Sequence, residues 1–138
     1  MNTPRQKICK ALGEAGCYLL CIVHLAEKIL RERIDAEELY EAAEVTEVIE
    51  ADCFVNDPAK LMKMMVPGNW KMEKYGMAYQ LKEGEAEITR YERTTTAGTL
   101  THFVVTDGKG GVTYDPLGDS QCVKLGKPVS KRVFRKVG

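Results

Sequence analysis

The sequence lacks an excess of charge of either sign. Its 138 residues include 20 Lys and Arg and 20 Asp and Glu, so the formal net charge at pH 7 is zero. Nucleic-acid-binding domains carry a basic surplus that neutralises phosphates. Because no such surplus exists here, we expect no nucleic-acid partner.

The chain also lacks a long hydrophobic segment. The apolar run from Tyr18 to Leu25 is far shorter than the roughly 20 residues that span a bilayer. No small-residue cleavage pattern follows it, so it does not have the form of a signal peptide. We therefore expect a cytoplasmic protein that does not engage a membrane.

A disulfide framework is missing as well. The cysteines are odd in number and irregular in spacing: Cys9, Cys17, Cys21, Cys53 and Cys122. With no export signal, they are expected to be reduced. Most should be small buried hydrophobes, so a cysteine in any other environment is a candidate for a functional role.

The first half of the chain has helical patterning. A helix is predicted over residues 16–33. A second begins at the N-cap Asp35, with Glu38 as its capping-box partner, and a third begins at the N-cap Asp57, with Pro58 at its first position. The predicted apolar stripe of the second helix consists of Leu39, Ala42, Ala43 and Val45.

The second half changes to short β-like runs separated by turns. The runs cover residues 78–81, 86–93, 100–106, 111–115, 122–125 and 131–135. Residues 107–111 (Asp-Gly-Lys-Gly-Gly) have the composition of a hairpin turn, and the basic pairs around the last run favour a solvated edge strand. Helices followed by strands predict one α+β domain over residues 1–138, with the N-terminal helices packed on a C-terminal antiparallel sheet.

Cys17 is the first candidate for a reactive group. Gly16 and Cys17 open an apolar run that continues to Leu30 without Pro or Gly, which predicts a central helix buried on most faces. The unpaired N–H groups and the positive dipole end of a first helical turn favour a thiolate. Cys17 is therefore the candidate nucleophile, although a lone cysteine is more often a core residue.

A cysteine nucleophile needs a base and a group that orients the base. His24 lies two turns further along the same helix, about 10 Å away in axial rise, which is too far from Cys17. His102 lies on a predicted strand, and Asp115 lies near the far end of the next one. A hairpin at residues 107–111 would bring His102 and Asp115 together.

At these positions the chain resembles a known family. Gly16-Cys17 opens a hydrophobic helix, residues 102–105 read His-Phe-Val-Val, and residues 114–118 read Tyr-Asp-Pro-Leu-Gly. In this order they resemble the papain-like cysteine peptidase superfamily, nearest to the bacteriocin-processing (double-glycine leader) peptidases. The likeness covers roughly residues 13–120. The layout also resembles a small bacterial or phage family of unassigned function.

The resemblance implies a papain-like fold and a hydrolase of the thiol protease class. Its catalytic triad would comprise Cys17 as nucleophile, His102 as general base and acid, and Asp115 as orienter. Cys17 and His102 would form a thiolate–imidazolium pair, and a peptide or protein substrate would be cleaved through an acyl-enzyme. No cofactor or metal is implied.

The chain departs from the family near its nucleophile. Relatives carry a Gln about six residues before the Cys, where it binds the oxyanion, but Ala11 stands there and the nearest Gln is Gln6. The backbone N–H of Cys17 is then the assured donor. Loss of one oxyanion donor typically costs ~10²–10³ in rate. Tyr18 also replaces the usual Gly after the nucleophile. The alternative is thus a catalytically inactive peptidase-like module that binds a peptide or protein partner.

A third interpretation uses the thiols differently. Cys17, Cys21 and His24 fall near one helix face and could ligate a metal, but the set lacks a CxxC pair and a fourth ligand. Cys21 could also serve as a resolving thiol, or be an inert core residue. Oligomeric state does not follow from the sequence.

Overall fold

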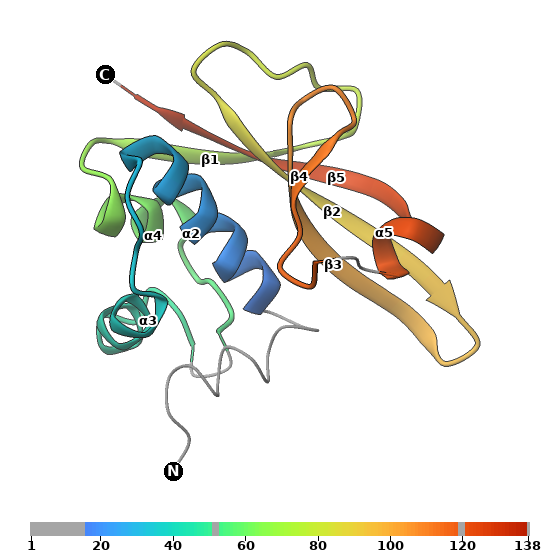
Figure 1. Ribbon diagram of the computed structural model, residues 1–138, viewed down its shortest axis with the longest axis horizontal. Helices are drawn as coiled ribbons and strands as arrows, with labels where there is room; N and C mark the ends of the chain where they lie inside the picture. Colours follow the sequence, from blue (N-terminus) through green and yellow to red (C-terminus); the bar gives the residue numbers. More distant parts are fainter. Residues whose placement is uncertain (1–15, 51–52, 119–120, 138) are drawn as a thin grey trace.

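The protein is an α+β domain in which helices precede a five-stranded antiparallel sheet. The computed structural model describes residues 16–50, 53–118 and 121–137 (Figure 1). Its elements are α2 (Gly16–Leu30), α3 (Ala36–Val45), α4 (Pro58–Met65), β1 (Trp70–Tyr75), β2 (Ala86–Thr95), β3 (Gly98–Thr106), β4 (Val112–Tyr114), α5 (Gln121–Leu125) and β5 (Lys127–Lys136). The predicted order of helices and sheet is confirmed.

The three predicted helices form, and local capping explains where they begin and end. α2 ends at Leu30, because Arg31 adopts a left-handed φ of 57°. The Asp35 carboxylate accepts the backbone N–H groups of Glu37 and Glu38 at the start of α3. The Asp57 carboxylate accepts that of Lys60 at the start of α4, as expected for N-caps.

The predicted apolar stripe of the second helix is partly wrong. Leu39 and Ala43 are buried, but Ala42 is exposed and Val45 is 82% exposed. Tyr40 is buried instead and joins the hydrophobic core. The helix ends at Val45, so this residue lies beyond the face that packs on the core.

The strand order is β1-β5-β2-β3-β4, with every neighbouring pair antiparallel. β5 therefore lies inside the sheet, and the prediction of a solvated edge strand is wrong. Two of its basic residues form ion pairs with neighbouring strands. Lys131 pairs with Glu87 on β2, and Arg135 pairs with Glu73 on β1.

Two predicted strands are wrong and one strand was missed. Residues 78–81 belong to the connection between β1 and β2, where the Tyr79 ring stacks on Tyr75 at 3.9 Å and its hydroxyl donates to Glu85. Residues 122–125 are helical, within α5. The missed strand is β1, an edge strand. Three of its six residues are charged, so its sequence has no clear β pattern.

The two faces of the sheet differ in chemistry. One face contributes Ile88, Val105 and Phe134 to the hydrophobic core that includes α2, α3 and α4. Figure 1 shows these helices on one side of the sheet, with α5 away from them. The alternation of strand side chains places Glu87 and Lys131 on the opposite face.

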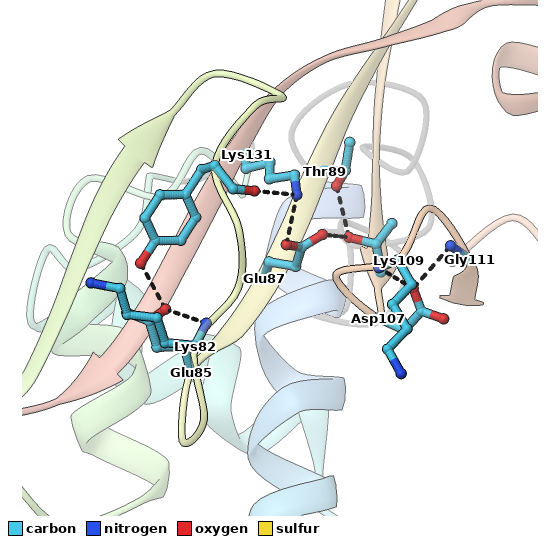
Figure 2. A network of polar contacts seen from close by, with 10 residues as sticks. Lys82, Glu85, Glu87, Thr89, Asp107, Lys109, Gly111 and Lys131 are labelled. Atoms are coloured by element: carbon cyan, nitrogen blue, oxygen red, sulfur yellow. Dashed lines mark hydrogen bonds and ion pairs between the residues drawn. The ribbon is translucent and has the colours of Figure 1, made fainter.

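That opposite face holds a buried polar network (Figure 2). The Lys131 ammonium lies 3.1 Å from a Glu87 carboxylate oxygen and donates to the Tyr79 carbonyl at 3.0 Å. The Thr106 hydroxyl donates to Glu87 and lies 2.7 Å from that of Thr89. The connection between β1 and β2 thereby becomes attached to the sheet.

No described helix meets the length and hydrophobicity of a membrane span; α2, the longest, has 15 residues.

Candidate active site

The candidate site forms where α2 meets the open edge of β3. β4 pairs with β3 only at Val105 and Thr106. At Phe103, the outer edge of β3 therefore faces α2 and not another of the described strands. The Cys21 thiol donates to the Phe103 carbonyl at 3.3 Å. Figure 1 shows α2 beside β3 and β4. The first turns of the helix therefore lie next to the residue that follows His102.

Cys17 is fully buried in the first turn of α2. Burial raises the pKa of its thiol, and this exceeds the lowering by hydrogen bonds from backbone groups of Phe103, Tyr18 and Cys17 itself. The negative charge of Asp115 raises the pKa further. Backbone amides thus act on the sulfur as predicted, but the expectation of a net thiolate-favouring environment is wrong, because desolvation outweighs them.

His102 and Asp115 are joined by a hydrogen bond. The His102 Nε2 atom lies 2.7 Å from Asp115 Oδ1, and the two side chains are 2% and 6% exposed. The turn between their strands is fixed by Asp107, whose carboxylate accepts the N–H groups of Lys109 and Gly111. The hairpin therefore brings these residues together, as its position in the sequence predicts.

Asp115 is held in place by the turn that follows it. Its Oδ1 also accepts the Leu117 N–H at 2.9 Å, and its carbonyl accepts the Gly118 N–H at 2.8 Å. Pro116 suits the second position of such a turn, and Gly118 has a φ of 82°, which favours glycine. The Asp-Pro-Leu-Gly sequence thus presents the carboxylate to His102.

Stacked rings join α2 to the strand that ends before Asp115. The His24 and Tyr114 rings lie 4.1 Å apart and within 5° of parallel. His24 is therefore a packing residue beside the site. From the sequence, His24 was a possible metal ligand, and Tyr114 was only the residue that precedes the predicted carboxylate.

The protonation of His102 follows from its partner. A carboxylate only accepts, so Nε2 carries the proton that it shares with Asp115. In the neutral ring, Nδ1 is then the atom that is able to take a proton. Since the Phe103 backbone contacts the Cys17 sulfur, the thiol lies close to the residue that carries this base.

The oxyanion prediction named the Cys17 backbone N–H and Gln6, and backbone groups do lie near the Cys17 sulfur. The backbone groups of Cys17 and Tyr18 lower the pKa of the Cys17 thiol. Gln6, the other predicted donor, lies outside the described residues.

The described part of the chain contains no group of three or more His, Cys, Asp or Glu side chains that could hold a metal ion. In the alternative set, Cys21 donates to a backbone carbonyl and His24 stacks on Tyr114. These contacts account for both side chains without a ligand role.

Comparison with known proteins identifies one family. The family model described as "Protein of unknown function, DUF261" matches residues 2–136. No curated protein and no solved structure matches the chain.

Proposed function

The chain belongs to the DUF261 family of proteins of unknown function, and we propose that it is a papain-like cysteine peptidase or amide hydrolase. Cys17 is the nucleophile, His102 the general base and acid, and Asp115 the orienter. The substrate is a peptide or protein, cleaved through an acyl-enzyme.

The observation that carries the proposal is the buried His102–Asp115 hydrogen bond. It defines which ring nitrogen is protonated, and the Cys17 thiol lies against the backbone of the next residue. Nucleophilic catalysis needs a thiol and a base held by an orienting group, and the His102–Asp115 pair, with the thiol against the Phe103 backbone, supports that arrangement.

The raised pKa of Cys17 defines how the first step proceeds. The resting thiol is neutral, so His102 Nδ1 takes its proton as sulfur attacks the substrate carbonyl carbon. The carbonyl π electrons move to oxygen, where the N–H groups of Cys17 and Tyr18 stabilise the charge. Collapse of this intermediate breaks the C–N bond, and His102 gives its proton to the leaving amine.

The second step hydrolyses the thioester that has formed on Cys17. His102 Nδ1 takes a proton from water, whose oxygen attacks the acyl carbon. The C–S bond breaks, the thiol regains its proton from His102, and the acid product leaves. Asp115 keeps Nε2 protonated and stabilises the imidazolium in both steps.

A second function is favoured by the burial of Cys17. The side chain is fully buried, and a buried thiol with a raised pKa is a weak nucleophile. An inactive peptidase-like module that binds a peptide or protein partner beside the same residues would keep the fold without turnover.

A peptide-based acyloxymethyl ketone, which alkylates catalytic cysteines, separates the two functions. The enzyme is expected to be labelled at Cys17 faster than at its other cysteines, as mapped by mass spectrometry. His102→Ala should remove this preference, whereas Cys122→Ala, at a partly exposed thiol, should leave it intact. Slow labelling spread over all five cysteines would refute the peptidase and favour the binding module.

A further inference from the structure

A cavity of about 330 Å³ lies beside the candidate site, on the side of the sheet that α2 covers. The residues that matter here are Tyr18, Phe54, Met72, Lys74, Phe103 and Arg132. Tyr18 and Phe103 directly follow Cys17 and His102 in the chain. The cavity is thus lined by the chain neighbours of both proposed catalytic residues, although the alternation of strand side chains directs Phe103 and His102 to opposite faces of the sheet.

The wall of the cavity is mostly apolar, and the charged side chains that line it are positive. Phe54, Met72 and Phe103 form much of its wall, and among the described residues its charged lining groups are Arg132 and Lys74, with no carboxylate. Neither cation forms an ion pair with a carboxylate in residues 16–50, 53–118 or 121–137. Lys74 is exposed, whereas Arg132 is partly buried, and a partly buried cation without a counter-charge favours an anionic ligand.

The orientation of Arg132 is fixed by its neighbours. Its guanidinium carbon lies 5.1 Å from the centroid of the Phe103 ring, and one of its nitrogens donates to the Ser130 hydroxyl. A guanidinium has five N–H donors, so others remain for a ligand. Contact with an aromatic ring and a planar fork suit Arg to carboxylate recognition.

The Tyr18 hydroxyl is a second, independent indication. Its oxygen is buried and has no hydrogen-bond partner among the residues that the structure describes, which is uncommon for a buried polar group. The Tyr18 ring stacks on the same Phe103 ring as Arg132 contacts, at 4.7 Å and 30°. Burial raises the pKa of Tyr18 well above its usual value, so the hydroxyl remains a donor that needs an acceptor.

We propose that this cavity binds a carboxylate carried on an apolar body, with Arg132 and Tyr18 as direct partners and Lys74 as a second cation. The assignment of this ligand as part of the substrate rests on the proposed function. The cavity would then select peptides that present an acidic group next to the bond that is cleaved.

The test uses two ligands that differ only in charge, N-acetyl-L-phenylalanine and its neutral amide, titrated into the ¹⁵N-labelled protein and followed by NMR. The acid should bind at least about tenfold tighter than the amide, since hydrogen bonds to charged groups have this order of effect. Shifts should centre on Tyr18, Phe103 and Arg132. Equal affinities, no binding of either ligand, or shifts elsewhere would overturn the proposal.

Variants show which groups are responsible. Arg132→Gln and Tyr18→Phe should each weaken binding of the acid about tenfold or more, with little effect on the amide, whereas Arg33→Gln, at an exposed position, should change neither. Tyr18→Phe removes a hydroxyl that has no hydrogen-bond partner in the described part of the chain, so the urea midpoint of this variant should be unchanged or higher. A folded Arg132→Gln or Tyr18→Phe variant that binds the acid normally would overturn the proposal.

The same titration with Cys17→Ala separates this inference from the catalytic one. A preference for the acid that persists in Cys17→Ala, in a protein whose wild type fails the labelling test, would support the cavity and refute the peptidase. Selective Cys17 labelling without a preference for the acid would do the reverse.

Discussion

At the scale of single residues, Cys17 is subject to two opposing influences. Backbone amides at the start of α2 and on β3 stabilise a thiolate, while full burial destabilises it and raises the pKa of the thiol. Sequence reasoning predicted the first influence, because a helix N-terminus is visible in the local pattern. It also predicted a helix buried on most faces, but it did not predict that burial would outweigh the backbone amides, because the extent of burial depends on which distant segments cover the residue.

The pairing of His102 with Asp115 was predictable for the opposite reason. Only a hairpin separates the two residues, and its turn is encoded by Asp107 and the glycines that follow. The unpartnered hydroxyl of Tyr18 had no comparable local signal. The one sequence feature that set Tyr18 apart was its bulk, at a position where the papain-like family that the chain resembles has Gly.

Replacing Asp115 tests its role as the partner of His102. Asp115→Ala removes the acceptor of a buried donor and of the Leu117 N–H, so the free energy of unfolding should fall by about 1–3 kcal/mol. Urea denaturation measures this loss. Asp115→Asn keeps an acceptor oxygen and is the matched control, with a smaller expected loss. Equal stabilities of the Ala and Asn variants would show that the hydrogen bond contributes nothing.

At the scale of elements, predictions were reliable where the signal was local. Asp35 and Asp57 cap their helices as expected, because a cap involves neighbours within one turn. The position of β5 was mispredicted because pairing partners lie far away in the chain. Its basic residues suggested an exposed edge, and no local sequence pattern reveals that Lys131 pairs with Glu87 on β2.

The Glu87–Lys131 pair yields a prediction about the sheet. Lys131→Met leaves Glu87 as a buried charge without its counter-ion, which should lower the free energy of unfolding by about 3–5 kcal/mol. The double variant Glu87→Leu/Lys131→Met removes both charges and should recover most of this loss. Lys127→Met, at an exposed position on the same strand, is the control and should change stability little.

Urea denaturation of the three variants checks this prediction. A double variant as unstable as Lys131→Met would indicate that packing, and not the unpaired charge, is responsible. A Lys131→Met variant with the same free energy of unfolding as the wild type would mean that the ion pair does not stabilise the pairing of β2 and β5.

At the scale of the whole molecule, the site depends on both halves of the chain. α2 supplies Cys17 and the β3–β4 hairpin supplies His102 and Asp115, so neither half contains the proposed triad. The general plan of helices on an antiparallel sheet was predictable from patterning. The cavity was not, because its lining groups come from α2, from α4 and the segment before it, and from three strands, and only the tertiary fold brings them together.

Burial of several acidic protons predicts how stability depends on pH. Desolvation raises the pKa values of Cys17, Cys21 and Tyr18 in the folded state. The unfolded chain therefore loses these protons first, and stability should fall as pH rises above about 8.5, the ordinary thiol value. Below that pH both states hold the protons, and these groups contribute no pH dependence.

Urea denaturation between neutral and alkaline pH measures this fall. Cys21→Ala removes one of the groups and should flatten the dependence, independently of the lysines and tyrosines that it leaves in place. An identical slope in the wild type and in Cys21→Ala would show that the buried thiol is not linked to stability.

The central claim, that Cys17 is a nucleophile served by His102, is tested most directly by trapping the acyl-enzyme. The protein is incubated with p-nitrophenyl acetate, quenched in acid, and mapped by mass spectrometry. The account predicts acetyl transfer to Cys17 ahead of every other cysteine in the wild type, and loss of that preference in His102→Ala. Acetylation spread evenly over the cysteines, or a Cys17 preference unchanged in His102→Ala, would contradict it.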